Sequence, residues 1–221
     1  MIQAVLFDLD GVIVDTLHYH FLAWEHMFHE LAGHISEHSI LLHEGRASRE
    51  ILPLLLEEAG VTLPEHLRQD FIDRKREYYR SIVNVTEYAG VFDVIGELRA
   101  RGYRTALVTA SALKNMEKSL SPEKRQYFDF LISGDEVPRA KPAPDPYLAA
   151  MKHLNLTADE CIVVENAPLG IESAKNAQMK CVAIETTLGA EYLVAADRIL
   201  HNVRDLLEIP ELQGIELTRP K

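Results

Sequence analysis

The chain opens with MIQAVLFDLDGVIVDT (residues 1–16), in which a short apolar run ends in two aspartates that are one residue apart. If residues 4–7 form a buried strand, the two-residue period of extended chain aims the side chains of Asp8 and Asp10 to the same side. Two carboxylates in one site repel each other unless a cation binds there or one of them keeps its proton. The pair therefore indicates catalysis, although an aspartate before a glycine is also common turn chemistry.

The composition of the chain limits what it can bind. Its 221 residues are 47% hydrophobic, which is enough for a full core and a smaller second unit. The net charge of −11 argues against nucleic acid or an anionic membrane as a partner, because both attract basic surfaces. No apolar run approaches the roughly 20 residues of a spanning helix, and the first residues lack the basic flank of a signal peptide. We expect a soluble, cytoplasmic monomer whose two cysteines are buried free thiols.

Most of the chain alternates short apolar runs with amphipathic stretches, which is the pattern of an α/β fold. Strands are predicted over residues 4–8, 104–111, 129–133, 161–166, 180–186 and 197–201. The helices predicted between them cover residues 91–102, 145–155 and 169–178. Such alternation predicts a Rossmann-like, doubly wound parallel sheet, whose ligands bind beyond the carboxyl ends of the strands.

Residues 16–86 break this rhythm, because their apolar spacing is helical and no strand pattern intervenes. Helices are predicted within residues 17–33, 48–60 and 64–83. We therefore expect a helical insert at residues 16–86 and a core made of residues 1–15 and 87–221. The end of the core, residues 216–221, is expected to be a frayed tail.

Polar side chains follow the predicted strands at the edge of the sheet where ligands bind. They are Asp8, Asp10, Thr109, Ser111, Lys141, Glu165 and Asn166. Together they predict a phosphoryl-transfer site, because an anionic nucleophile reaches a phosphate only when a metal, an ammonium group and hydrogen-bond donors screen the charge. There are structural alternatives, since Thr109 and Ser111 could cap the next helix and Lys141 could be an exposed loop lysine.

The predicted mechanism gives each of these side chains a role. Asp8 attacks phosphorus, and Asp10 protonates the leaving oxygen. Thr109 and Lys141 hold the phosphoryl oxygens. A Mg²⁺ ion offsets the crowded oxygens, and its expected ligands are Asp8, Asp10, Glu165 and Asn166.

Four segments resemble, in order and spacing, the motifs of the haloacid dehalogenase superfamily: DLDGVIVDT (8–16), VTAS (108–111), the lysine before PAPD (141) and VVENAPLGI (163–171). The resemblance covers essentially the whole chain and implies a Rossmann-like core with a helical cap. It assigns the nucleophile, acid/base, hydroxyl, lysine and metal-binding acid of the family to Asp8, Asp10, Thr109, Lys141 and Glu165. Asn166 departs from the mutases and many of the phosphatases, which carry aspartate there, and its neutral amide is expected to weaken metal binding.

Within the superfamily, the chain resembles β-phosphoglucomutase and the related sugar-phosphate phosphatases. This resemblance rests on TLHYHFLAW (16–24), ASRE (47–50) and DRKREYY (73–79). It implies that the substrate is contacted by His20, Trp24, Arg49, Lys75, Ser111 and Asn115. Arg49 could instead pair with Glu50 or Glu57 on its own helix, and a histidine on a helix, such as His20, is often structural.

These residues predict a Mg²⁺-dependent phosphatase that acts through an aspartyl phosphate on a small phosphorylated metabolite, a hexose phosphate. The alternative is a β-phosphoglucomutase that interconverts β-glucose 1-phosphate and glucose 6-phosphate, since both reactions need the same core residues. Asp10 argues against dehalogenation, because a halide leaves without a proton. A regulatory module without activity is a third hypothesis, but such a loss would first remove Asp8 or Asp10, and both are present.

Overall fold

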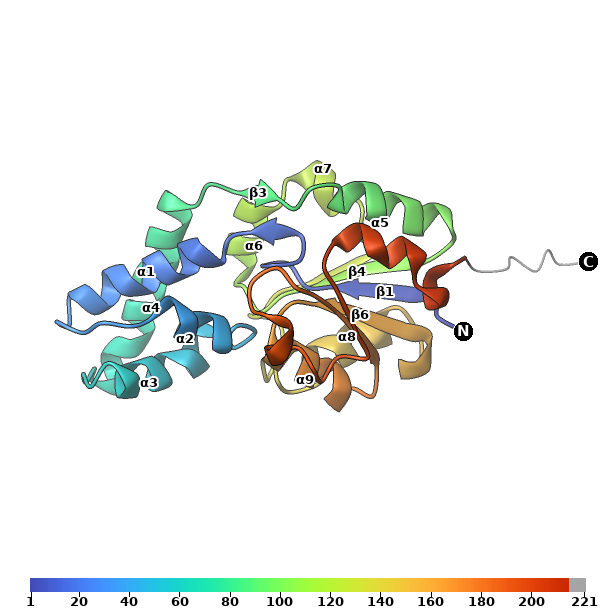
Figure 1. The fold of residues 1–221 in the computed structure, drawn as a ribbon. Helices are drawn as coiled ribbons and strands as arrows, with labels where there is room; N and C mark the ends of the chain where they lie inside the picture. The colour runs from blue at the N-terminus through green and yellow to red at the C-terminus, as the bar shows by residue number, and fades with distance from the viewer. Residues whose placement is uncertain (215–221) are drawn as a thin grey trace, which may run out of the picture.

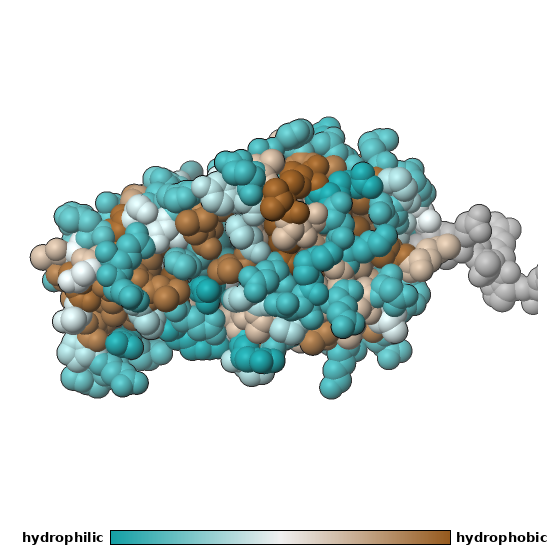
Figure 2. All heavy atoms as spheres, turned by 60° about the horizontal axis from the view of Figure 1, so that its bottom comes forward, coloured by the Kyte–Doolittle hydropathy of each residue, from teal (hydrophilic) through white to brown (hydrophobic). Residues whose placement is uncertain are grey.

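The computed structural model describes residues 1–214, as a parallel sheet with helices on both faces and a group of four helices at one end (Figure 1). The predicted frayed tail, residues 216–221, lies outside the described residues. None of the helices within residues 1–214 is long and apolar enough to cross a membrane. Figure 2 shows a mostly hydrophilic face on which hydrophobic side chains gather in several small groups.

The sheet contains six parallel strands in the order β5-β4-β1-β6-β7-β8. They are β1 (Ala4–Phe7), β4 (Arg104–Val108), β5 (Phe130–Ile132), β6 (Cys161–Glu165), β7 (Lys180–Ile184) and β8 (Arg198–Leu200). β1 is central, and its residue Phe7 pairs with Leu107 on one side and Val164 on the other. The strand order reverses at β1, so the carboxyl end of β1 is the switch point at which ligands bind in such sheets. The predicted doubly wound fold is confirmed.

Alternating side chains of the strands pack on opposite faces of the sheet. In β1, Phe7 belongs to one hydrophobic cluster and Leu6 to the other. The first cluster includes side chains of α5 (Val91–Ala100), and the second includes side chains of α8 (Asp145–His153) and α9 (Pro168–Asn176). The remaining short helices of the core are α6 (Leu113–Ser119), α7 (Pro122–Arg125), η1 (Ala158–Glu160), η2 (Ala190–Tyr192), η3 (Val203–Glu208) and η4 (Pro210–Leu212). Because both faces of β1 are covered, the polar residues that follow it in the sequence, Asp8 and Asp10, lie at the end of the sheet.

Four helices between β1 and α5 form a second unit, called the cap below: α1 (Leu17–His29), α2 (Glu37–Leu42), α3 (Ser48–Glu58) and α4 (Glu65–Ile82). They share a hydrophobic cluster that includes Trp24, Phe28, Leu55 and Phe71. Two short antiparallel strands connect the cap to the core, β2 (Val14–Asp15) and β3 (Thr86–Glu87). The sequence pattern does not predict α2, because six residues are too few to show a helical period. The division of the chain at residues 16 and 86 stays a prediction.

Candidate active site

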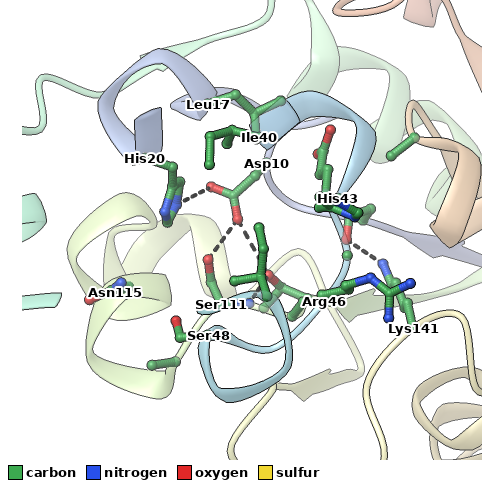
Figure 3. A pocket seen from close by; sticks show the side chains of 18 of the residues that line it. Asp10, Leu17, His20, Ile40, His43, Arg46, Ser48, Ser111, Asn115 and Lys141 are labelled. Carbon is green, nitrogen blue, oxygen red and sulfur yellow. Dashed lines mark hydrogen bonds and ion pairs between the residues drawn. The ribbon is translucent and has the colours of Figure 1, made fainter. Parts of the chain in front are cut away.

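A pocket lies between the carboxyl end of the sheet and the cap (Figure 3). Its lining includes the core residues Asp8, Asp10, Thr109, Ser111, Asn115, Lys141 and Glu165. The cap residues on its lining include His20, Trp24, Glu44, Arg46, Ser48 and Lys75. Of the site residues predicted from the sequence, only Arg49 and Asn166 are absent from the lining, and Asn166 is buried against Glu44. The structure therefore brings most of the predicted residues to one place.

Asp8 follows β1 directly and belongs to a buried cluster of charges. The Lys141 Nζ lies 2.5 Å from Oδ1 of Asp8 and 2.7 Å from Oε1 of Glu165. It also donates to the Val108 carbonyl, and the Tyr147 hydroxyl donates to the same Glu165 oxygen at 2.7 Å. Burial raises the pKa of Asp8 to about 8 although the Lys141 ammonium opposes the shift, and the two carboxylates outweigh burial to raise the pKa of Lys141. A nucleophile and a cation for phosphoryl oxygens thus lie within hydrogen-bond distance of each other.

Asp10 is held separately, by hydroxyl donors and a histidine (Figure 3). Its Oδ1 accepts a hydrogen bond from the Thr16 hydroxyl, and its Oδ2 accepts from Ser111 at 2.8 Å and from Thr109 at 3.5 Å. The His20 Nε2 lies 3.5 Å from Oδ1. Burial would raise the pKa of Asp10, but the nearby His20 ring and the hydroxyl groups of Thr16 and Ser111 outweigh it and lower the pKa to about 2. In this arrangement Asp10 is an anion that can accept a proton.

The cap brings a buried lysine to the same pocket. The Lys75 Nζ lies 3.0 Å from Nδ1 of His20 and 4.9 Å from the centre of the Trp24 ring. The His20 ring also stacks on Tyr79, with ring centres 4.1 Å apart. Burial lowers the pKa of Lys75 to about 7, and burial together with the Lys75 charge lowers the pKa of His20. Since no carboxylate of residues 1–214 forms an ion pair with Lys75, we expect an anionic substrate to provide its counter-charge.

The cap arginine that lines the pocket is Arg46, and the predicted Arg49 lies outside it. Arg49 is in the first turn of α3, where its guanidinium donates to the Pro138 carbonyl at 3.3 Å and lies 3.7 Å from Glu50. Its side chain is 48% exposed. Arg46 is in the loop before α3, and its buried Nε has no hydrogen-bond partner within the described residues. The structure therefore places Arg46 on the pocket lining and Arg49 against the core loop at Pro138, and the contact of Arg49 with substrate stays a prediction.

Glu44 is a site residue that the sequence motifs do not predict. The Asn166 amide donates to both carboxylate oxygens of Glu44, at 3.1 and 3.0 Å, and to the Thr187 hydroxyl at 3.1 Å. Burial raises the pKa of Glu44 well above its usual value, and the charges of Asp8 and Glu165 add to the shift. A divalent cation beside these carboxylates would oppose the shift and favour the charged form of Glu44. The segment between α2 and α3 carries no motif. The signal that could have found Glu44 is the departure at Asn166, because an amide can donate to an acid and an aspartate carboxylate cannot.

The oxygen atoms around Asn166 fit a hard divalent cation such as Mg²⁺. Oδ1 of Asn166 is buried and accepts no hydrogen bond within the part of the chain that the structure describes. The carboxylates of Asp8 and Glu165 follow the neighbouring strands β1 and β6 and share Lys141. No three Asp, Glu, His or Cys side chains of residues 1–214 form a metal cluster by themselves. The carboxylate of Asp10, the fourth predicted ligand, accepts hydrogen bonds from hydroxyl groups, and its role as a ligand stays a prediction.

This geometry is typical of phosphoryl-transfer enzymes, because Asp8 and Lys141 place a carboxyl nucleophile and an ammonium group side by side while Asp10 is positioned to exchange a proton. The family model of the haloacid dehalogenase-like hydrolases matches residues 5–184, and the chain belongs to this family. The predicted membership is confirmed. The predicted class of enzyme, a phosphohydrolase or phosphotransferase of this superfamily, is confirmed as well.

Three similar proteins show how far the likeness extends. The chain is 25% identical to the phosphorylated carbohydrates phosphatase of Thermotoga maritima, over 99% of this chain and 95% of that protein. The structure of β-phosphoglucomutase from Clostridium difficile matches with a TM-score of 0.82 at 27% identity and covers 93% of each chain. A mutant of CbbY from Rhodobacter sphaeroides, in complex with xylulose-(1,5)bisphosphate, matches with a TM-score of 0.80 at 26% identity. That match covers 93% of this chain and 96% of the CbbY chain.

Proposed function

We propose that the protein is a Mg²⁺-dependent phosphatase that hydrolyses a small phosphorylated sugar through an aspartyl phosphate on Asp8. The observation that carries the proposal is the contact of Asp8 with Lys141 at 2.5 Å, while Asp10 is held separately by hydroxyl donors. This arrangement keeps the nucleophile apart from the group that moves the proton. Bound Mg²⁺ would supply positive charge against the phosphoryl oxygens, and Asp8, Glu165 and Asn166 would hold it.

The reaction would proceed in two halves at the same phosphorus. In the first half, an oxygen of Asp8 attacks phosphorus, the ester P–O bond breaks, and Asp10 gives a proton to the leaving sugar oxygen. Asp10 must take up this proton as the substrate displaces the hydrogen bonds that hold its pKa near 2. In the second half, water attacks the phosphorus of the aspartyl phosphate, Asp10 takes a proton from that water, and the P–O bond to Asp8 breaks. Lys141 and Thr109 hold the phosphoryl oxygens throughout.

The cap side of the pocket supports a sugar phosphate as the substrate. Lys75 and Arg46 place two cations on its lining, and Trp24 adds an aromatic ring. Such groups bind hydroxyl oxygens and a second anionic group at a distance from the reacting phosphate. The relative named as a phosphatase of phosphorylated carbohydrates and the CbbY complex with xylulose-(1,5)bisphosphate support the same class of substrate. We expect a hexose phosphate.

A β-phosphoglucomutase activity is the second candidate, and the TM-score of 0.82 with the Clostridium difficile enzyme favours it. A mutase would return the phosphoryl group from Asp8 to another sugar hydroxyl instead of to water. It would need the same nucleophile and the same acid/base residue. The difference is how completely the closed cap excludes water from the pocket.

One experiment tests the proposal and separates the two candidates. A panel of sugar phosphates and small phosphate esters is scored for phosphate release with Mg²⁺, and β-glucose 1-phosphate with its bisphosphate activator is scored for glucose 6-phosphate. Phosphate release that is lost in Asp8→Asn is the expected result. Glucose 6-phosphate formed faster than phosphate would favour the mutase. Neither product from a folded protein that binds Mg²⁺ would overturn both candidates.

A further inference from the structure

The neutral amide of Asn166 lies against a carboxylate that comes from the cap. Nδ2 of Asn166 donates to both carboxylate oxygens of Glu44, so a charge-assisted hydrogen bond joins core and cap. Asn166 is fully buried, and its Oδ1 has no hydrogen-bond partner among residues 1–214. With an aspartate at position 166, the same contact would place two carboxylates together. The amide of Asn166 and the acid of Glu44 are therefore complementary.

The loop that carries Glu44 is shaped to approach the core. Gly45 has a φ of +96°, a backbone conformation that favours glycine. A Cβ atom on Gly45 would lie 3.2 Å from Cβ and 3.3 Å from Cδ of Lys141, so a larger residue would push the loop away. In Figure 1 the turn after α2 extends from the cap toward the core. The close approach of this loop delivers the carboxylate of Glu44 to the predicted metal site.

Glu44 also changes the balance of charge at that site. Asp8, Glu44 and Glu165 line the same pocket as the ammonium group of Lys141. Lys141 forms ion pairs with Asp8 and Glu165, whereas Glu44 has no cationic partner within the described chain. A divalent cation near these groups would offset the repulsion between the carboxylates. The three acids of this cluster therefore outnumber its one ammonium group by two.

We propose that Glu44 is a positioning residue that supplies, from the cap, the negative charge that the metal site lacks at position 166. The inference rests on the proposed Mg²⁺-dependent function. Closing the cap would bring Glu44 toward the oxygen atoms that hold the metal, and bound metal would favour the closed cap in return, since coupling between two equilibria is reciprocal. The Asn166 amide holds the Glu44 carboxylate in place. An aspartate is therefore not needed at position 166.

Direct titration of the whole protein with Mg²⁺ alone tests this proposal. Glu44→Gln keeps the size of the side chain and removes its charge. We expect calorimetry to show Mg²⁺ binding weakened about tenfold, the lower end of the losses seen when groups around a metal site are changed. Glu57→Gln, a matched control, removes the same charge from an exposed position on α3 and should leave the affinity unchanged. Equal affinities of Glu44→Gln and the wild type would overturn the proposal.

A charge swap distinguishes the positioning role from a general loss of structure. Asn166→Asp combined with Glu44→Gln exchanges the carboxylate and the amide between core and cap. The double variant should regain Mg²⁺ affinity to within about threefold of the wild type, because the two substitutions act on one contact and are not additive. Asn166→Asp alone should raise Mg²⁺ affinity little above that of the wild type, since the new carboxylate lies against that of Glu44. A double variant as weak as Glu44→Gln would contradict the proposal.

Trp24, the single tryptophan of the chain, provides a probe of the cap because it lines the pocket. Mg²⁺ should change its fluorescence in the wild type and much less in Glu44→Gln. Equal changes in both proteins would overturn the coupling of metal and cap. If the proposed function alone is wrong, Mg²⁺ affinity will still depend on Glu44 while the phosphate esters remain unreacted. If esters are hydrolysed and Mg²⁺ affinity does not depend on Glu44, only the inference about Glu44 fails.

Discussion

The core and cap sides of the pocket differ in how their charges are balanced. In the core, Lys141 is paired with Asp8 and Glu165 at 2.5 and 2.7 Å. In the cap, Lys75 and Arg46 line the pocket, and no acid of residues 1–214 forms an ion pair with either. The core groups are therefore suited to a step that is the same for every phosphate ester. The cations of the cap, in contrast, are suited to bind a substrate that carries negative charge away from the reacting phosphate.

The largest expected effect is the loss of the core nucleophile. Asp8→Asn should lower kcat about a thousandfold or more on every phosphate ester, because a neutral amide is a poor nucleophile. Steady-state rates with a sugar phosphate and with acetyl phosphate measure the loss, and thermal unfolding checks that the fold is intact. A folded variant that keeps a tenth of the wild-type rate would refute the role of Asp8.

The two cap arginines should differ in their effect on substrates. Arg46→Ala should lower kcat/KM about tenfold or more for a sugar phosphate, since one charge-assisted contact to the substrate is lost. It should change acetyl phosphate hydrolysis much less, because that small acyl phosphate has no sugar to reach the cap and tests the core alone. Arg49→Ala is the matched control, and its half-exposed side chain predicts little change with either substrate. Losses of equal size on both substrates would show that Arg46 does not select the sugar.

The lowered pKa of Lys75 predicts a pH dependence of substrate binding. With a pKa of about 7, this lysine loses its proton as the pH rises from 7 to 9, so KM for a sugar phosphate should rise over that range. Acetyl phosphate is the control and should show no such rise. In the variant Lys75→Met the rise of KM with pH should disappear. A rise that persists in this variant would show that another group is responsible.

The same shift has a defined sign for stability. The unfolded chain binds a proton at Lys75 up to about pH 10, and the folded chain only up to about pH 7. Lys75 therefore destabilises the fold progressively as the pH falls through that window, and the full cost is reached below pH 7. Lys75→Met should raise the thermal unfolding temperature more at pH 6 than at pH 10. The opposite order would contradict a lowered pKa.

The smallest expected effect concerns Tyr147, whose buried hydroxyl donates to Glu165. Tyr147→Phe should lower the free energy of unfolding by about 1–2 kcal/mol, because the lost hydrogen bond is to a carboxylate. Tyr79→Phe is the control. The Tyr79 hydroxyl contacts the neutral Ser119 hydroxyl, so its removal should lower the free energy of unfolding by less. Chemical unfolding of both variants makes the comparison. A larger cost for Tyr79→Phe would contradict this account of the Glu165 cluster.

The sequence predicts the core side of the pocket well because the sheet constrains it. Residues that follow parallel strands must meet at one edge, so Asp8, Thr109 and Glu165 are brought together by topology alone. Lys141 lies in a loop, and the family motif rather than the strand pattern indicates its place. Tyr147 is missed, because a tyrosine on the apolar face of a helix has the same pattern as any core residue.

The cap side is predicted less well, because its loops have no period and no neighbouring strand to fix them. The short motif around Arg49 points to a guanidinium in the cap, but the loop conformation brings Arg46 to the pocket instead. Glu44 lies in no motif of its own, and the departure that points to it, Asn166, is distant along the chain. The left-handed backbone of Gly45 sets the path of that loop, and the sequence alone does not reveal it.

Trapping the phosphorylated enzyme would show directly whether Asp8 is the nucleophile. The protein is mixed with Mg²⁺ and a sugar phosphate that it hydrolyses, and the reaction is quenched in acid within a single turnover. The protein is then digested, and the peptides are mapped by mass spectrometry. We expect one phosphoryl group on the peptide that contains Asp8, and none in Asp8→Asn. Turnover at the full rate without any phosphorylated peptide, or with the phosphoryl group on another residue, would contradict this role of Asp8.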